Sequence, residues 1–427
     1  MINSMDIKRQ YEEFILKPVV NPITLREGKG VKLIDRSGKE YLDFTAGGGI
    51  SILGYNNEYT EYVQDAAIKQ MKRIPHIPHY IYYSEPAAAL AEKLAEITPG
   101  KLKKMFFSNS GSEAVEGAIR TARKYAGKFE LLALQQGFMG RTIGAASLTG
   151  ISRNKKGIGP LLPGVYHIPA PHCLRCSLRQ TYPGCGIACA DYVEDFIAYG
   201  TCGDVAALFV EPILGDAGVL VPPDGYFEKL ISLCGRHGIT LVIDETLTGL
   251  GRTGKMFASE HWGMEPEIMT LGKALGGGFP LGAFIVTERV ATVFEYEDFS
   301  STAGGNPVAC AAGLATIEVL EKERLCEKAA ATGAYLMEAL QRLALDSPVV
   351  EEVRGKGLFI GIEIVEKQSR VASPQKAQEI KQKMVERGYL FDIFGPSSLR
   401  LTPPLIIEKE HVNAFLEGFG SVLKGMG

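Results

Sequence analysis

Two segments near the middle of the chain carry residue types that could do chemistry together. The apolar run 241–243 ends in the carboxylates Asp244 and Glu245, and Lys273 follows a second apolar stretch and precedes the glycines 276–278. Each segment is uninformative by itself, because acids are common at strand ends and a lone lysine is usually a solvated surface group. Together they meet the needs of pyridoxal-phosphate (PLP) chemistry, in which a lysine amine holds the cofactor as a Schiff base and an acid keeps its pyridine nitrogen protonated.

A third segment could hold a phosphate group. Ser110, Gly111 and Ser112 follow an apolar run and open a helical pattern that includes Glu113. Hydroxyls and backbone N–H groups at the start of a helix attract a phosphate, and the helix dipole adds to the attraction. The same residues equally fit an N-cap followed by a glutamate in the first helical turn. The pattern alone leaves both interpretations open.

The elements that must position these residues alternate between strand and helix. The spacing of polar residues predicts a helix over 113–125, and short apolar runs predict buried strands before and after it. These strands are expected at 105–107, 131–134, 206–210, 241–243 and 284–286. The alternation indicates an α/β fold with a mainly parallel sheet that is covered on both faces. In such sheets ligands bind beyond the carboxyl ends of the strands, where Asp244 lies.

The two ends of the chain are expected to form a smaller unit. The turn 36–38 lies between two short apolar runs and predicts a β-hairpin. From Pro307 a long helix is followed by VRGKGLFIGIEIV and LRLTPPLII, which predict strands of an α+β unit. We therefore expect an N-terminal segment, 1–60, to pack with a C-terminal small domain, 307–427, and a large domain, 61–306, to lie between them in the chain.

The composition limits the class of protein. The chain has 427 residues, of which 46% are hydrophobic and 22% are charged, as in soluble globular proteins. Its formal net charge of −3 and its lack of a basic run argue against nucleic acid as a partner. No apolar run reaches the roughly 18 residues that a membrane span needs, and the charged N-terminus does not resemble a signal peptide. We expect a cytoplasmic protein that binds neither nucleic acid nor a membrane.

A short insertion in the large domain, 171–190, contains four of the eight cysteines. Cys173, Cys176, Cys185 and Cys189 follow the spacing C-x2-C-x8-C-x3-C. Four thiolates at such spacing could bind a structural zinc ion or an iron–sulfur cluster. Free thiols or disulfides would explain the same pattern without a metal, and the sequence does not decide between these possibilities.

The motifs resemble, in content and in order, those of the class III (ω-amino-acid) aminotransferases, in particular 4-aminobutyrate aminotransferase-like enzymes. The resemblance covers nearly the whole chain and rests on NSGSEA, GFMGRT, EPILGDAG, DETLTGLGRTG and STAGGNP. It implies a fold-type I PLP-dependent transferase with PLP as its cofactor. Asp244 would then partner the pyridine nitrogen, and Lys273 would form the Schiff base and shuttle a proton. The phosphate would be bound by Ser110, Gly111 and Ser112.

The resemblance also assigns residues to the cofactor ring, the partner subunit and the substrate. Phe138 would stack on the ring, and Thr302 would reach the phosphate bound in a partner subunit, which implies a homodimer or a higher homo-oligomer. Arg141 would bind a substrate carboxylate. Glu211 and Arg400 would form a switch in which the glutamate covers the arginine while an ω-amine is bound. A guanidinium suits this task because its planar fork meets a carboxylate with two parallel hydrogen bonds.

The chain departs from the family's pattern at several positions near the predicted site. Thr246 and Leu247 stand where many relatives have valine and glutamine, so the usual amide contact to the cofactor's ring hydroxyl is missing. Gly48 stands where relatives that use 4-aminobutyrate have a bulky aliphatic residue, which predicts a roomier substrate pocket. Asp216 lies where EPILGDAG differs from the common EPVQGEGG.

The resemblance implies an aminotransferase that moves an amino group from an ω-amino acid, of the 4-aminobutyrate or ornithine type, or from a related amine, to a 2-oxo acid. Racemases and epimerases of the same family, which act on neutral α-amino acids, and related decarboxylases use the same residues. The sequence does not separate these activities. A binding protein without activity is disfavoured, because the lysine, the aspartate, the phosphate-binding residues and both arginines are all present.

Overall fold

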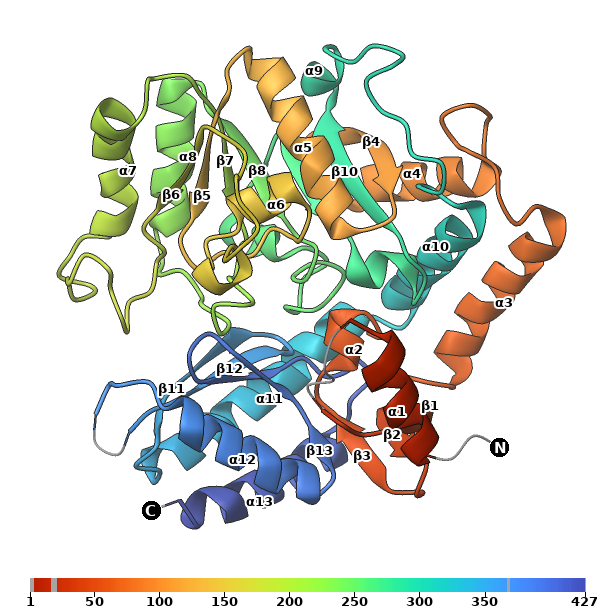
Figure 1. The fold of residues 1–427 in the computed structure, drawn as a ribbon, viewed down its shortest axis with the longest axis vertical. Coiled ribbons are helices and arrows are strands. Elements are labelled where there is room, and N and C mark those ends of the chain that lie inside the picture. The colour runs from red at the N-terminus through yellow and green to blue at the C-terminus, as the bar shows by residue number, and fades with distance from the viewer. Residues whose placement is uncertain (1–3, 17–20, 367–368, 427) are drawn as a thin grey trace.

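The computed structural model describes residues 4–16, 21–366 and 369–426 of the chain. Its upper part is built on a seven-stranded sheet, and its lower part contains two four-stranded sheets (Figure 1). In the large sheet β10 runs antiparallel to both of its neighbours, and the other neighbouring strands are parallel. The predicted α/β fold with a mainly parallel sheet is therefore confirmed. In spatial order the strands are β4 (Leu102–Ser108), β10 (Gly282–Thr287), β9 (Ile268–Leu271), β8 (Thr240–Asp244), β7 (Val205–Val210), β5 (Glu130–Leu134) and β6 (Val165–Ile168).

The central strands of the large sheet are buried on both faces. Every residue of β5, β7 and β8 is buried. Alternate side chains of these strands enter two separate hydrophobic cores, because successive residues of a strand point to opposite faces. One core lies against α7 (Ala188–Gly200) and α8 (Tyr226–His237), and the other lies against α5 (Gly111–Ala126) and α6 (Ile143–Leu148).

The lower part joins the two ends of the chain. The predicted hairpin around the turn 36–38 is present as β2 (Lys32–Asp35) and β3 (Glu40–Asp43), which pair antiparallel. β3 also pairs in parallel with β13 (Tyr389–Leu390), so the N-terminal segment shares a sheet with the C-terminal region. This sheet is completed by β1 (Leu25–Lys29). The second sheet has the order β11 (Val350–Lys356), β12 (Phe359–Ile364), β15 (Ser398–Leu401) and β14 (Asp392–Phe394).

The remaining helices cover or connect these sheets. Helix α10 begins at Pro307, as predicted, because Asn306 caps it by accepting hydrogen bonds from the backbone N–H groups of Val308 and Ala309. No helix within the described ranges is both long enough and apolar enough to cross a membrane. The helices of this group are α1 (Ser4–Phe14), α2 (Ala46–Gly49), α3 (Glu58–Arg73), α4 (Glu85–Ile97), α9 (Glu288–Ala291), α10 (Pro307–Lys322), α11 (Leu325–Leu345), α12 (Pro374–Glu386) and α13 (Lys409–Lys424).

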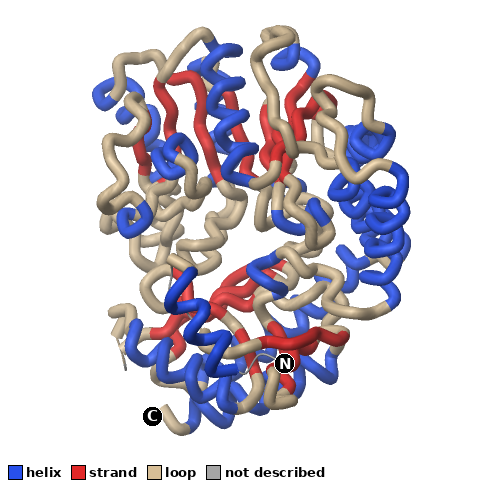
Figure 2. Tube along the Cα trace, turned by 45° about the vertical axis from the view of Figure 1, so that its right-hand side comes forward, coloured by secondary structure: helices blue, strands red, loops and turns tan. Residues whose placement is uncertain are grey.

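The loops that carry the predicted site lie where the upper and lower parts meet. Figure 2 shows a band of loops between the strands of the large sheet and the two lower sheets. The segments that follow β4, β5, β7 and β9 hold most of the residues predicted to bind the cofactor and the substrate. The loop after β7 contacts the second lower sheet through Asp216, which pairs with Arg400 of β15. The carboxyl ends of the parallel strands therefore face the lower part.

Candidate active site

Asp244 and Lys273 lie at the same edge of the large sheet. Asp244 is the last residue of β8, and it is paired in the ladder with Thr270 of β9. Lys273 follows Thr270 by three positions and begins the short 3-10 turn Lys273–Gly276. The register of the two strands therefore brings the acid and the amine to one place, as the sequence predicted.

The backbone at Lys273 is strained. Its φ is +45°, in the left-handed region that residues other than glycine rarely adopt. Such a conformation costs on the order of 1–3 kcal/mol and persists only where the surrounding structure enforces it. Here the turn is fixed between β9 and the buried residues Ala274 and Leu275. Strain of this kind is common at functional sites.

Burial and mutual attraction set the charges of this pair. Burial raises the pKa of Asp244, although the backbone N–H of Thr246, which donates to Oδ1 at 2.8 Å, and the nearby Lys273 amine favour the carboxylate. Burial also lowers the pKa of Lys273, and the charge of Asp244 opposes that change. The amine is thus easier to deprotonate than an exposed lysine, which a nucleophile and proton carrier needs.

The predicted phosphate-binding segment lies beside Asp244 and Lys273. A Cβ placed on Gly111 would lie 2.8 Å from Cγ2 of Thr246, and one on Gly272 would lie 3.1 Å from the backbone nitrogen of Gly111. The glycines thus allow three loops to meet closely. Ser110 is indeed the N-cap of α5, since its Oγ accepts a hydrogen bond from the N–H of Glu113 at 3.2 Å. The helix start and its dipole point to the same edge of the sheet.

The residues that meet here fit PLP. The side-chain hydroxyls of Thr246 and Thr270 are buried next to Asp244 and favour its charged form, but neither makes a hydrogen bond of good geometry with any described residue. Buried hydroxyls without partners are costly, so polar atoms of a bound group would satisfy them. With an amine, a buried acid and a helix N-terminus nearby, the donor set matches a phosphorylated pyridine aldehyde.

Phe138 and Arg141 follow β5 on one loop. The Arg141 guanidinium carbon lies 5.3 Å from the centre of the Phe138 ring, and the backbone N–H of Arg141 donates to Ser112 Oγ at 3.0 Å. Arg141 is exposed, and its Nη1 makes only a long contact of 3.5 Å to Asn154. An exposed guanidinium next to the phosphate-binding segment is able to receive a substrate carboxylate.

Arg400 pairs with Asp216, whereas the resemblance implied Glu211 as the acid that covers it while an ω-amine is bound. Nη1 of Arg400 donates to Oδ1 of Asp216 at 3.0 Å, and the guanidinium lies 3.4 Å from the centre of the Phe394 ring. The Glu211 carboxyl instead accepts the backbone N–H groups of Phe138 at 2.8 Å and of Gly215 at 3.1 Å. Both acids lie in EPILGDAG, so the motif contains the acid that contacts Arg400, although the resemblance pointed to the other acid.

Comparison with known proteins identifies the family. The family model described as aminotransferase class-III matches residues 16–423. The chain belongs to the class III aminotransferases. It is 37% identical over 426 residues to an acetylornithine aminotransferase from Methanothermobacter thermautotrophicus, with 100% of both chains covered. It is also 36% identical over 399 residues to a leucine/methionine racemase from Thermococcus litoralis, covering 93% of this chain and 89% of that protein.

A solved structure supports the same conclusion. An ω-transaminase from Pseudomonas jessenii, in complex with PMP, has a TM-score of 0.93 and 29% identity to this chain, with 98% of each chain covered. This class III aminotransferase is therefore a fold-type I PLP-dependent enzyme, as predicted. The roles of its individual residues stay predictions.

Leu247 departs from the family's pattern, and it packs between two loops next to the predicted site of this aminotransferase. A Cβ on Gly49 would lie 2.6 Å from Leu247 Cδ1, and one on Gly215 would lie 2.7 Å from Leu247 Cδ2. Leu247 thus fills the space between two glycine loops. Gly48 is half-buried with a φ of +77°, and a Cβ there would meet nothing within 4 Å. A side chain at Gly48 would therefore enter open space, and the substrate pocket there stays a prediction.

The Cys-rich insertion brings its four cysteines together. Its four cysteines line one small cavity together with His172, and all four are free thiols. Among the residues that the structure describes, no group of three or more His, Cys, Asp or Glu side chains is arranged to hold a metal ion. The prediction of a zinc ion or an iron–sulfur cluster is therefore not supported.

Proposed function

We propose that the enzyme moves the amino group of an ω-amino acid, or of a related amine, to a 2-oxo acid. The observation that carries the proposal is the meeting of Lys273, Asp244 and the start of α5 at one edge of the sheet, with two arginines nearby. Relatives named as acetylornithine aminotransferases and a neighbour named as an ω-transaminase support the substrate class.

Bound PLP supplies an aldehyde that takes the substrate's amine and a ring that accepts electrons from it. Lys273 Nζ holds the cofactor and then carries a proton to and from the carbon that bears the amino group. The lowered pKa of Lys273, caused by burial, prepares the amine for this role. Asp244 would keep the ring nitrogen protonated, Phe138 would contact the ring, and Ser110, Gly111 and Ser112 would bind the phosphate at the start of α5.

Two arginines bind the carboxylates of the two substrates. Arg141, which is exposed, binds the distal carboxylate of an ω-amino acid. Asp216 covers Arg400 while that donor is bound, and it moves aside when the α-carboxylate of a 2-oxo acid arrives. One site thus accepts two substrates of different shape in turn.

The enzyme acts as a homodimer or a higher homo-oligomer. Thr302 lies in the loop between β10 and α10 and is exposed in the single chain. On this proposal its hydroxyl reaches the phosphate held by the partner subunit. The exposed apolar side chains of Ile68, Met71 and Ile74 in and after α3 would be covered by such an association.

The racemase of Thermococcus litoralis among the relatives gives a second candidate activity. Space next to Gly48 and the apolar Leu247 favour a bulkier neutral α-amino acid. Incubation of the PLP-loaded enzyme with 2-oxoglutarate and 4-aminobutyrate, ornithine or N-acetylornithine should produce glutamate. A parallel incubation with L-leucine alone tests for inversion. Inversion without transfer from any ω-amine would assign the enzyme to the racemases instead.

A further inference from the structure

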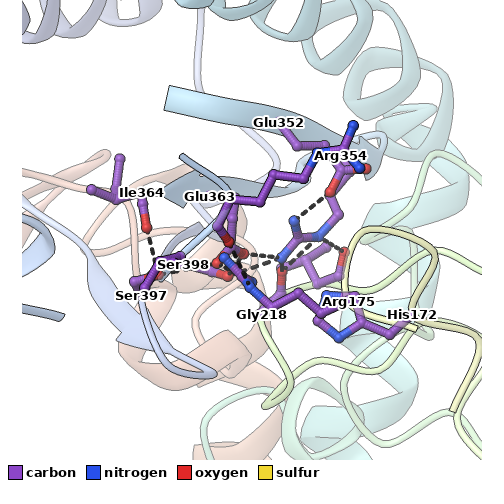
Figure 3. Close-up of polar contacts among 12 residues, drawn as sticks. His172, Arg175, Gly218, Glu352, Arg354, Glu363, Ile364, Ser397 and Ser398 are labelled. Atoms are coloured by element: carbon purple, nitrogen blue, oxygen red, sulfur yellow. Dashed lines mark hydrogen bonds and ion pairs between the residues drawn. The ribbon is translucent and has the colours of Figure 1, made fainter. Parts of the chain in front are cut away.

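A buried ion-pair network joins the Cys-rich insertion to the sheet that carries Arg400. Its centre is Glu363 on β12, which is fully buried and accepts hydrogen bonds from Arg354, Arg175 and Ser398 (Figure 3). The two arginine nitrogens each lie 2.7 Å from a carboxylate oxygen of Glu363. Burial alone would raise the pKa of Glu363, but these partners outweigh burial and lower the pKa to about 2. Glu363 is therefore a carboxylate at any working pH.

Arg354 extends the network to the loop that carries Asp216. Its Nη2 donates to the carbonyl oxygen of Gly218 at 2.7 Å, and its Nε donates to the carbonyl oxygens of Gly218 and Val219 at 3.1 Å. The loop also rests directly on β12, since a Cβ on Gly361 would lie 2.5 Å from the carbonyl oxygen of Gly218. Arg354 thus fixes the backbone two residues after Asp216.

The same network holds the strand of Arg400. In the ladder between β12 and β15, Glu363 pairs with Ser398 and Gly361 pairs with Arg400. Residues two apart on a strand project from the same face, so Ser398 and Arg400 lie side by side. The Ser398 hydroxyl donates to Glu363 and accepts from Arg354 Nη2 at 2.9 Å. Both members of the Asp216–Arg400 pair are therefore attached to one cluster of charges.

Arg175 is the contribution of the Cys-rich insertion to this cluster. Besides its ion pair with Glu363, its Nε donates to the carbonyl oxygen of Arg370 at 3.3 Å. The Arg175 side chain is 24% exposed, compared with 8% for Arg354 and 1% for Glu363. Loss of Arg175 would leave Glu363 paired with Arg354. Loss of Arg354 would in addition remove the donor of the Gly218 and Val219 carbonyl oxygens, in a more buried part of the network. Arg175 is thus the member that the fold should tolerate losing.

We propose that Arg175, Glu363 and Arg354 are positioning residues for the Asp216–Arg400 pair, and that the Cys-rich insertion thereby sets how Arg400 meets an α-carboxylate. The inference rests on the proposed function, because it takes Arg400 as the receptor of that carboxylate. A contact with two parallel hydrogen bonds needs accurate placement, so a small displacement of β15 or of the loop 215–219 weakens it.

Steady-state kinetics of three variants test the proposal. Arg175→Gln removes the charge, Arg175→Lys keeps it, and Arg236→Gln is the matched control, because it removes the exposed ion pair with Glu194 outside the network. In Arg175→Gln the KM for the 2-oxo acid should rise about three- to tenfold, while kcat/KM for the ω-amino donor should change less than about twofold. Arg175→Lys should recover part of the loss, and the control should match the wild type.

A double variant separates this role from a general loss of structure. Since Arg175 acts through Asp216 and Arg400, its effect should be non-additive with that of Asp216→Asn. Additive effects, or equal changes for both substrates in Arg175→Gln, would overturn the proposal.

Amide hydrogen exchange provides a readout that does not depend on activity. In Arg175→Gln, peptides that cover 215–219 and 398–401 should exchange faster than in the wild type and in Arg236→Gln. If the wild type transfers no amine but this exchange pattern is found, the proposed function has failed and the positioning role stands. Unchanged exchange in both peptides would overturn the positioning role itself.

Discussion

Asp216 and Glu211 lie five positions apart on one loop but meet different partners. The first makes an ion pair with Arg400, and the second accepts two backbone N–H groups. Asp216→Asn should leave Arg400 without its covering charge, so that α-amino acids gain as donors relative to ω-amino acids. We expect the ratio of the two kcat/KM values to rise about tenfold, or about 1.4 kcal/mol.

Glu211→Gln is the matched comparison for that variant. It also removes an acid from the same loop, but the acid does not touch Arg400. The ratio of α-amino to ω-amino donors should stay near its wild-type value even if the rates fall. A larger change of the ratio in Glu211→Gln than in Asp216→Asn would return the switch role to Glu211.

The buried carboxyl of Glu211 should make stability depend on pH. Burial raises its pKa from 4.5 to about 8, so the folded protein binds a proton at neutral pH that the unfolded chain has lost. Stability therefore falls as the pH rises toward 8 and levels off above it. Glu245, whose pKa burial raises to about 7, adds a smaller effect of the same sign. The buried histidines act in the opposite direction only below their ordinary pKa of 6.5.

Thermal unfolding of the cofactor-free protein measures this effect. Between pH 6.5 and 8 the wild type should lose up to about 2 kcal/mol of stability, and Glu211→Gln should lose clearly less. A wild-type Tm that rises over this interval, or an equal slope in both proteins, would show that Glu211 is ionised in the folded state.

The sequence predicted that Lys273 and Asp244 lie together, and the structure places them at one edge of the sheet, because each lies in a local motif at a strand end. It could not assign the partner of Arg400, because that contact joins a loop residue to a strand residue 184 positions away in the chain. EPILGDAG offers two acids, and only the path of the loop decides which of them faces β15. The role of Leu247 as a filler between Gly49 and Gly215 likewise depends on loops that are distant in the sequence.

At the scale of elements, the start of α5 must approach the loop after β8 closely. Gly111→Ala would place a methyl group 2.8 Å from Thr246 Cγ2 and force the two segments apart. We expect PLP binding to weaken by about 1–3 kcal/mol, measured by titration of the cofactor-free protein. Gly235→Ala is the control, since a Cβ on this exposed helical glycine meets nothing within 4 Å. Unchanged PLP affinity in Gly111→Ala would mean that α5 does not bind the phosphate.

The Cys-rich insertion provides a prediction about metal and thiol content. Protein purified without chelator should contain zinc and iron far below one atom per chain, because the described residues form no metal-binding group. All eight cysteines of the sequence should react with a thiol reagent after denaturation without reductant, since each is a free thiol in the structure. About one zinc per chain, with four thiols protected until a chelator is added, would reinstate the metal site.

Elements with strong local patterns were predictable, and elements that depend on distant partners were not. All five predicted strands of the large sheet lie within β4, β5, β7, β8 and β10. No pattern in the sequence separately predicted β6, which is only partly buried, or the two- and three-residue strands β13 and β14. Strands this short are defined by the neighbours they pair with rather than by their own residues.

Across the whole molecule, the two ends of the chain are held together in one sheet. β3 and β13 pair although they lie at opposite ends of the sequence, and the Asp216–Arg400 pair links the upper and lower parts at the site. If Arg400 binds the 2-oxo acid as we propose, substrate exchange there is coupled to contacts between these parts. The division of the chain at residues 60 and 307, the homodimer and the cytoplasmic location stay predictions.

We propose above all that Lys273 is the residue that holds PLP and transfers the proton. Borohydride reduction of the PLP-loaded enzyme, followed by peptide mapping, fixes the cofactor to the residue that holds it. The pyridoxyl group should be found on the peptide that contains Lys273 and nowhere else, and Lys273→Ala should carry none while keeping the wild-type fold by circular dichroism. A pyridoxyl group on another lysine of the wild type, or amine transfer by Lys273→Ala at the wild-type rate, would contradict the claim.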